Sequence, residues 1–202
     1  MAERTTHVRD DTEEAAMTTT DSTVKLPTPG TYAIDKAHTE VGFVARHLIG
    51  TKVRGRFTDF DGTITIAERP EDSKVEAVVQ TASIVTGTDM RDDHLRTNDF
   101  LDAPNHPTMT FTSTGVTKVS DAEWKLAGDL TIRGVTKPVV FDLELHGAGP
   151  GMQPGSEVVG FSAVTEIDRR DFGVSFSGVL EGGAIVVGNK VRIELEVEAG
   201  RQ

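Results

Sequence analysis

Apolar and polar residues alternate with a period of two along most of the chain after its first 30 residues. The clearest example is VRIELEVE at 191–198, in which apolar side chains alternate with charged ones. Further alternating segments lie at 41–46, 53–58, 63–66, 75–79, 109–113, 124–132, 141–146 and 159–167. Because successive side chains of a strand point to opposite faces, the pattern predicts about eight or nine strands with one apolar face each. Such short strands at regular spacing are typical of an antiparallel sandwich or barrel.

The amino-acid composition also favours strands. Val, Ile and Thr together make up 58 of the 202 residues, whereas Leu occurs only 10 times. β-Branched side chains are stiff in a helix and fit the pleated surface of a sheet. The composition therefore predicts an all-β protein and argues against a helical bundle.

One charged segment, TDMRDDHLRTNDFL at 88–101, lacks the strand alternation. Its residues fall near helical spacing, and Asp89 is of a type that caps helices. Pro104 follows soon after, and the residue before a proline avoids the helical region. We therefore predict a short helix between two strands, lying over one end of a barrel.

The first 30 residues differ from the rest of the chain. They are rich in Thr, Asp and Glu, and their few apolar residues show no period. We predict a disordered tail at 1–30 and a folded domain at 31–199. The tail lacks the apolar core of a secretory signal, and no segment reaches the roughly 20 apolar residues of a transmembrane helix. We therefore expect a cytoplasmic protein without stable membrane insertion.

Charge and missing residue types exclude several classes of function. The formal net charge is −11, so the surface should repel nucleic acid and anionic membranes. The chain has no Cys, which excludes disulfides, thiolate metal sites and a cysteine nucleophile. Because it has one Trp and one Tyr, we expect no aromatic platform for stacking bases or sugars.

The predicted helix carries the residues that most resemble a catalytic group. Asp92 and His94 are close in sequence, with Asp99 nearby, and a carboxylate beside an imidazole can orient a general base. The alternatives are a helix held by ion pairs, or a site where Arg91 and Arg96 bind an anionic group. The sequence contains no nucleophile, phosphate-loop or dinucleotide motif. We therefore predict neither an enzyme mechanism nor a cofactor.

Histidines provide two further candidates. His47 continues the apolar phase of 41–46, so it is either a strand-end histidine bonded to the backbone or a polar group at a tunnel mouth. A metal could also be held by histidines that approach one another in space, namely His38, His47, His94 and His106. No pair of them has the i,i+2 spacing of a strand or the i,i+4 spacing of a helix. We therefore predict no metal site.

The inward phases of the strands mix large and small side chains. Phe111 is followed by Ser113, and Phe161 by Ala163. An eight-stranded barrel has an interior that side chains fill or that holds one small ligand. Because a packed core also alternates large and small residues, the pattern leaves a filled core and an apolar tunnel both open.

Six motifs follow one another along the folded part of the chain. They are YAIDKAHTEVGFVARHL at 32–48, VRGRFTDFDGTI at 53–64, RDDHLRTNDFLDAPNHPTMTFTS at 91–113, LAGDLTIRGVTKPVVFDLEL at 126–145, DRRDFGV at 168–174 and GNKVRIELEVE at 188–198. In this order and spacing they resemble the YceI-like family, lipocalin-like proteins associated with polyisoprenoid binding. The resemblance covers about residues 31–199.

The resemblance implies an extended eight-stranded antiparallel up-and-down barrel with a short helix near its mouth. It also implies a long apolar pore for a polyprenyl chain, a polar group near the opening and, often, a homodimer. Many members of the family are exported, and the N-terminus of this chain departs from them. The family brings no established enzymatic mechanism.

We therefore predict a lipid-binding barrel that sequesters, carries or stores an isoprenoid or a similar long-chain amphiphile. The predicted lining comprises Phe43, Phe57, Phe111, Trp124, Leu126, Phe161 and Phe176. The predicted head-group region comprises His47, Arg91 and His94. Two alternatives stay open. One is an enzyme acting on a hydrophobic substrate through Asp92 and His94, and the other is a scaffold with a filled core.

Overall fold

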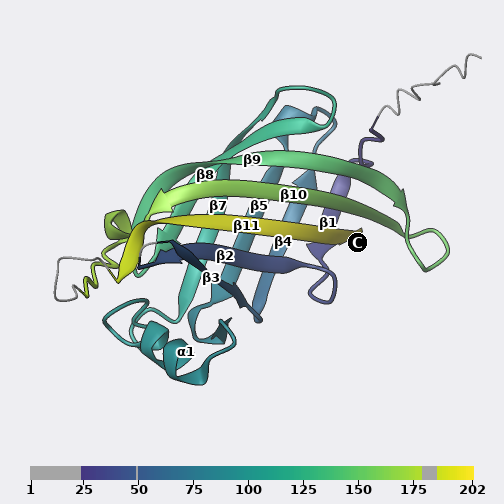
Figure 1. Ribbon diagram of the computed structural model, residues 1–202. Helices are drawn as coiled ribbons and strands as arrows, with labels where there is room; N and C mark the ends of the chain where they lie inside the picture. Colours follow the sequence, from purple (N-terminus) through teal and green to yellow (C-terminus); the bar gives the residue numbers. More distant parts are fainter. Residues whose placement is uncertain (1–23, 49, 179–185) are drawn as a thin grey trace, which may run out of the picture.

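A computed structural model describes residues 24–48, 50–178 and 186–202, and most of them lie in one curved antiparallel sheet (Figure 1). The strands are β1 Gly30–Ile34, β2 Glu40–His47, β3 Thr51–Phe57, β4 Phe60–Ile66, β5 Lys74–Gln80, β6 Ile84–Val85, β7 Thr108–Lys118, β8 Glu123–Ile132, β9 Val135–Pro150, β10 Glu157–Asp168 and β11 Val187–Arg201. Their order in the sheet is β1-β4-β5-β7-β8-β9-β10-β11-β2-β3-β6. The predicted all-β class is confirmed.

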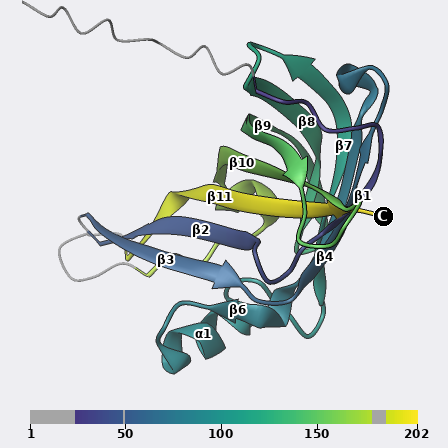
Figure 2. The same cartoon turned by 90° about the vertical axis from the view of Figure 1, so that its right-hand side faces the viewer.

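The sheet closes on itself through its first strand. β1 pairs with β4 on one side and with the end of β11 on the other, where Ile34 lies opposite Ala199. The closed ring therefore consists of β1, β4, β5 and β7 to β11, which confirms the predicted eight-stranded antiparallel barrel. The first part of β11 pairs instead with β2, and β2, β3 and β6 continue the sheet toward the helix (Figure 2).

Three long strands form one side of the barrel (Figure 1). β9, β10 and β11 have 16, 12 and 15 residues. At about 3.3 Å per residue, the longer two span about 50 Å. Alternation of apolar and polar side chains keeps one face of each strand inside the barrel along this length. The result is a barrel long enough to enclose an extended chain.

The predicted helix is present but shorter than its segment. α1 covers Asp89–Arg96, and its N-cap is Thr88, whose carbonyl accepts the backbone N–H groups of Arg91 and Asp92. The prediction that Asp89 caps the helix is therefore wrong, because Asp89 is already its first residue. The helix ends well before Pro104, since the N–H and hydroxyl of Thr97 both donate to the carbonyl of His94. Three short 3-10 helices also occur, η1 Pro70–Asp72, η2 Thr81–Ser83 and η3 Arg169–Phe172.

The last residues of the predicted tail lie along the barrel. The carbonyl of Lys25 accepts the N–H of Ala148 at 3.0 Å. The N–H of Thr28 donates to Glu157 Oε1 at 3.0 Å, and the Tyr32 hydroxyl donates to the carbonyl of Thr28 at 2.7 Å. Hydrogen bonds thus hold the segment 24–30 against β9 and β10. Residues 1–23 lie outside the described residues, and their disorder stays a prediction.

Two large clusters of buried side chains occupy the ends of the barrel. The first comprises Phe57, Ile84, Phe100, Met109, Leu130, Ile132, Ile167, Phe172 and Val174. It packs against Leu95 of α1 and Leu101 just beyond it, so the helix segment covers this end. The second comprises Tyr32, Ile64, Trp124, Leu145, Val159 and Ala199. No described helix is long and apolar enough to cross a membrane.

Candidate functional site

A cavity of about 480 Å³ lies inside the ring, and we call it the main cavity. Every strand of the ring contributes to its wall, as do Leu26, Pro27 and Pro29 of the segment before β1. The wall is apolar over most of its area. Asp61 and Glu68 are the charged residues that line it in the described part of the chain, and both are carboxylates. This volume and this lining are in the range of small-ligand sites in proteins.

Glycines let aromatic rings lie flat against the wall. A Cβ added to Gly128 would collide with the ring of Phe111. The same ring meets Phe141 edge-on, with ring centroids 5.4 Å apart and an interplanar angle of 86°. The mixture of large and small residues therefore places rings over neighbouring strands instead of across the middle of the barrel. This arrangement answers the question that the sequence left open, because this part of the interior is hollow.

Four of the predicted lining residues meet at the main cavity. Phe111, Trp124, Leu126 and Phe161 come from β7, β8 and β10, and all of them line it. The indole N–H of Trp124 is buried and has no hydrogen-bond partner among the described residues. The wall thus offers a long apolar surface with almost no polar group to orient a ligand.

The other predicted residues lie elsewhere. Phe43, Phe176, His47, Arg91 and His94 line a second cavity of about 230 Å³ at the α1 end, which we call the second cavity. It also contacts Arg46, Leu95, Phe100, Val186 and Val187. The two cavities follow one another along the inward face of β2, because Val41 lines the main one and Phe43 the second.

Phe57 lines neither cavity, so its predicted place on the pore wall is not what the structure shows. It is only 9% exposed and packs in the first core cluster, opposite Ile84 of β6. The ring of Phe43 lies 5.9 Å from it. β6 and the helix segment cover this end of the barrel, and strand alternation does not reveal such a cover.

Asp92 and His94 do not form the pair that an enzyme mechanism would use. Asp92 is 4% exposed, and its carboxylate accepts the N–H of Thr86 at 2.9 Å and the Thr86 hydroxyl. His94 Nε2 lies 2.8 Å from Asp99 Oδ2 instead. The His94 ring also meets Phe100 and Phe176 edge-on. Asp92 therefore anchors the start of the helix, and the carboxylate beside the His94 imidazole is that of Asp99.

Arg91 also bonds to the protein itself. Its Nε donates to the Thr86 hydroxyl oxygen at 2.6 Å, and its Nη2 donates to the Thr86 carbonyl at 2.9 Å and to Thr88 Oγ1 at 3.2 Å. The guanidinium thus ties the helix to the preceding loop. The structural alternative in the sequence was a helix held by ion pairs with carboxylates. Arg91 is instead bonded to threonines.

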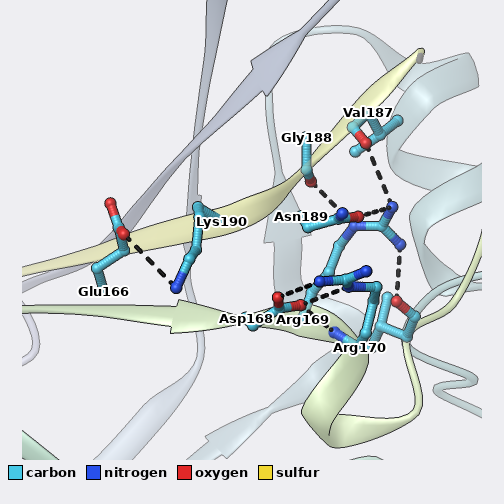
Figure 3. Close-up of polar contacts among 9 residues, drawn as sticks. Glu166, Asp168, Arg169, Arg170, Val187, Gly188, Asn189 and Lys190 are labelled. Atoms are coloured by element: carbon cyan, nitrogen blue, oxygen red, sulfur yellow. Dashed lines mark hydrogen bonds and ion pairs between the residues drawn. The ribbon is translucent and has the colours of Figure 1, made fainter.

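Arg169 is a buried cation that the sequence analysis missed (Figure 3). It is 5% exposed, and its guanidinium donates to the carbonyls of Val174 at 2.7 Å, Gly188 at 3.0 Å and Val187 at 3.2 Å. Its Nη2 also donates to Asn189 Oδ1 at 3.2 Å. Burial lowers the pKa of Arg169 from its ordinary value, although the charge of Asp168 opposes this. Ile167 lies on the inward face of its strand, and alternation with a period of two places Arg169 on the same face. This pattern could have identified Arg169 from the sequence.

Asp168 and Arg170, on either side of Arg169, form an ion pair at the protein surface (Figure 3). Arg170 donates through Nε at 2.9 Å and through Nη2 at 2.6 Å to the two carboxylate oxygens. These bonds hold the pKa of Asp168 well below its usual value. The three residues together fix η3 against the start of β11, beside the second cavity.

Residues 32–199 match the family model of the YceI-like domain. A UPF0312 protein of Staphylococcus aureus strain MSSA476 is 34% identical over 168 residues, which cover 83% of this chain and 95% of the relative.

Two solved structures share the fold. The YceI protein of Campylobacter jejuni has 34% identity and a TM-score of 0.68, covering 83% of this chain and 96% of that one. A domain from Saccharophagus degradans, described as polyisoprenoid-binding, has 15% identity and a TM-score of 0.64, covering 87% of this chain and all of that one. The second likeness concerns the fold alone.

Proposed function

Because the chain belongs to the YceI-like family, we propose that it binds a long-chain amphiphile, of which an isoprenoid is our leading candidate, inside the main cavity. The observation that carries this proposal is a cavity of about 480 Å³ whose wall is apolar along every strand of the ring. The polyisoprenoid-binding description of the Saccharophagus degradans domain agrees with it. The protein would sequester, carry or store this ligand.

The apolar lining of the main cavity indicates that affinity arises from burial of the ligand's hydrocarbon chain. Each buried CH₂ group contributes about 0.8 kcal/mol, so a long chain binds tightly without specific polar contacts. Specificity should therefore depend on the length and girth of the chain more than on its chemistry. We propose that Phe111, Trp124, Leu126 and Phe161 contact the chain directly.

We place the polar end of the ligand toward the second cavity, where His47 and His94 are the candidate polar contacts. Support comes from the order of the two cavities along the inward face of β2, where Val41 lines the main cavity and Phe43 the second. Phe43 and Phe176 would contact the ligand between its chain and its head. Arg91, with two of its nitrogens bonded to Thr86 and Thr88, would act by holding the helix in position.

A charge placed on the cavity wall tests the proposal. Phe161→Asp would put a carboxylate against the bound chain, and desolvating it costs several kcal/mol. Binding of a C20 prenyl alcohol, measured by displacement of a fluorescent lipid, should fall by at least about a hundredfold. The matched control is Val140→Asp, because Val140 is 52% exposed on the neighbouring strand β9. It should bind as the wild type does.

Native mass spectrometry of the purified protein, before and after organic extraction, supplies the second measurement. A lipid that leaves on extraction from the wild type and is absent from Phe161→Asp supports the proposal. A folded Phe161→Asp protein that still binds the prenyl alcohol like the wild type contradicts it.

We further propose that the protein is a homodimer in the cytoplasm. One edge of β3 supports self-association, because in the described residues β3 pairs with β6 only at Arg56 and Phe57. A strand edge of this kind can pair with a second copy. Light scattering after size-exclusion chromatography tests the dimer, and cell fractionation tests the location.

A further inference from the structure

We propose that Asp35, His38 and Glu198 form a binding site for a divalent transition-metal ion, for which Zn²⁺ is the best-suited probe. The spacing of the histidines along the sequence does not predict this group. The structure instead brings one imidazole and two carboxylates together, with their ligand atoms all within 4.8 Å of one another. Imidazole nitrogen and carboxylate oxygen are the donors that suit zinc, whereas Mg²⁺ and Ca²⁺ prefer oxygen alone.

The two distances from His38 to the carboxylates are close to those of a metal site. His38 Nδ1 lies 2.9 Å from Asp35 Oδ2 and 3.7 Å from Glu198 Oε1. Around a tetrahedral ion with bonds of about 2.0–2.1 Å, neighbouring ligand atoms are about 3.3 Å apart. Both separations therefore differ from the required value by about half an ångström or less. All three side chains are partly exposed, so they can make this adjustment and leave a position for water.

Backbone contacts hold the segments that carry Asp35 and Glu198 together before any ion arrives. The N–H of Asp35 donates to the carbonyl of Glu198 at 2.8 Å. The Thr39 hydroxyl accepts the N–H of Glu198 at 3.1 Å and donates to its carbonyl at 3.2 Å. The N–H of Ala37 donates to Asp35 Oδ1 at 2.8 Å, which leaves Oδ2 directed at His38. Because the backbone around the site is held in this way, binding an ion orders only side chains.

The charges around the triad also favour a cation. In the described part of the chain, no lysine or arginine lies within ion-pair distance of Asp35 or Glu198, and the group that does is the imidazole of His38. Lys36, which lies between Asp35 and His38 in sequence, pairs instead with Asp59 and Asp61. Two carboxylates thus converge on one ring nitrogen without a lysine or arginine to neutralise them. A bound divalent ion would supply the missing positive charge.

The position of the triad connects it to the main cavity. β11 changes partner here, since Ala199 pairs with Ile34 of β1 and Glu196 pairs with Glu40 of β2. The turn from β1 to β2 lies beside the C-terminal end of β11 (Figure 1). The sequence neighbours of the three donors, Ile34, Thr39 and Val197, all line the main cavity. An ion bound by the triad would therefore join the turn from β1 to β2 to β11 at the seam of the barrel.

A zinc titration of the tag-free, chelator-washed protein tests the proposal. We expect one Zn²⁺ per chain by competition with a fluorescent chelator, and no comparable binding of Mg²⁺. His38→Ala, Glu198→Gln and Asp35→Asn should each weaken Zn²⁺ binding by about tenfold or more, because each removes one ligand. Long-range ¹H–¹⁵N spectra should show that Nδ1 of His38 shifts on addition of Zn²⁺.

Matched controls separate this site from other histidines. His146→Ala removes an exposed histidine that contacts Ser162 on the outside of the barrel, and His7→Ala removes the histidine of the N-terminal segment. Both should bind Zn²⁺ like the wild type. Glu198→Gln keeps the backbone bonds of the seam, so its melting temperature without metal should match that of the wild type. Equal Zn²⁺ affinity in the wild type and all three triad variants would overturn the proposal, as would loss of binding in either control.

Discussion

Phe57 and Phe161 occupy equivalent positions in the alternation of their strands, yet they face different surroundings. Phe57, at the end of β3, packs against Ile84 and belongs to a filled cluster beneath the helix segment. Phe161, on β10, is half-buried and lines the main cavity. In both strands the alternation of apolar and polar residues places the phenylalanine on the inward face. Whether an inward side chain meets other side chains or open space thus depends on what covers that end of the barrel.

The largest expected effect contrasts these two residues directly. Phe57→Ala removes a ring from a filled core and should lower the free energy of unfolding by about 3–5 kcal/mol. Phe161→Ala enlarges an existing cavity, so it should lower stability by less than half as much while weakening binding of a prenyl alcohol. Urea unfolding of both variants measures the difference. Equal losses of unfolding free energy in the two variants would mean that side chains fill the main cavity in solution.

The next effect concerns how the filled end is sealed. Arg169→Ala would remove the guanidinium donors from the buried carbonyl of Val174 and from the partly buried carbonyls of Val187 and Gly188. We expect a loss of about 3 kcal/mol or more, because each unsatisfied buried group costs about 1–3 kcal/mol. Arg170→Ala is the control, since its ion pair with Asp168 lies at the surface, where solvent screens it and its contribution is small. Comparable chemical denaturation midpoints for the two variants would contradict a structural role for Arg169.

A smaller effect tests the polar contacts of the second cavity. Arg91→Ala removes donors to Thr86 and should lower stability by about 1 kcal/mol. Because the guanidinium is already engaged, we expect the same modest change in affinity for a prenyl diphosphate and for the matching alcohol. Calorimetry on this pair of ligands measures it. A selective loss of about tenfold for the diphosphate would instead place Arg91 on the head group.

The smallest effect is a pH dependence beside the second cavity. Arg170 holds the pKa of Asp168 below its unfolded value, so this carboxylate stabilises the fold above about pH 4. That contribution is lost as the pH falls through the lowered pKa of the folded state. Asp168→Asn should therefore flatten the decline of the melting temperature below about pH 4, while leaving its slope near neutral pH unchanged. Thermal unfolding across this pH range provides the measurement. The same decline of the melting temperature in the variant and the wild type would show that the ion pair does not stabilise the fold.

The local structure and the class of fold follow from residues that are close together in the sequence. Alternation along β9, β10 and β11, together with the scarcity of Leu, predicted strands in an antiparallel sandwich or barrel, and the charged segment 88–101 predicted the short helix. The choice of a barrel came from the resemblance to the YceI-like family. These features depend on residues that are neighbours in sequence, because the direction of a side chain along a strand follows from its parity. The same parity identified Phe111, Trp124, Leu126 and Phe161 as inward residues.

Only the tertiary structure decided which inward residues meet a cavity and which polar groups meet each other. Asp92 is joined to Thr86 and not to His94, and Glu198 reaches His38 from the far end of the chain. Arg169 bonds to the start of β11 across the end of the barrel. Contacts of this kind arise when the sheet closes and its ends are covered. A period of two carries no information about either event, because it specifies a face of the sheet and not what lies opposite.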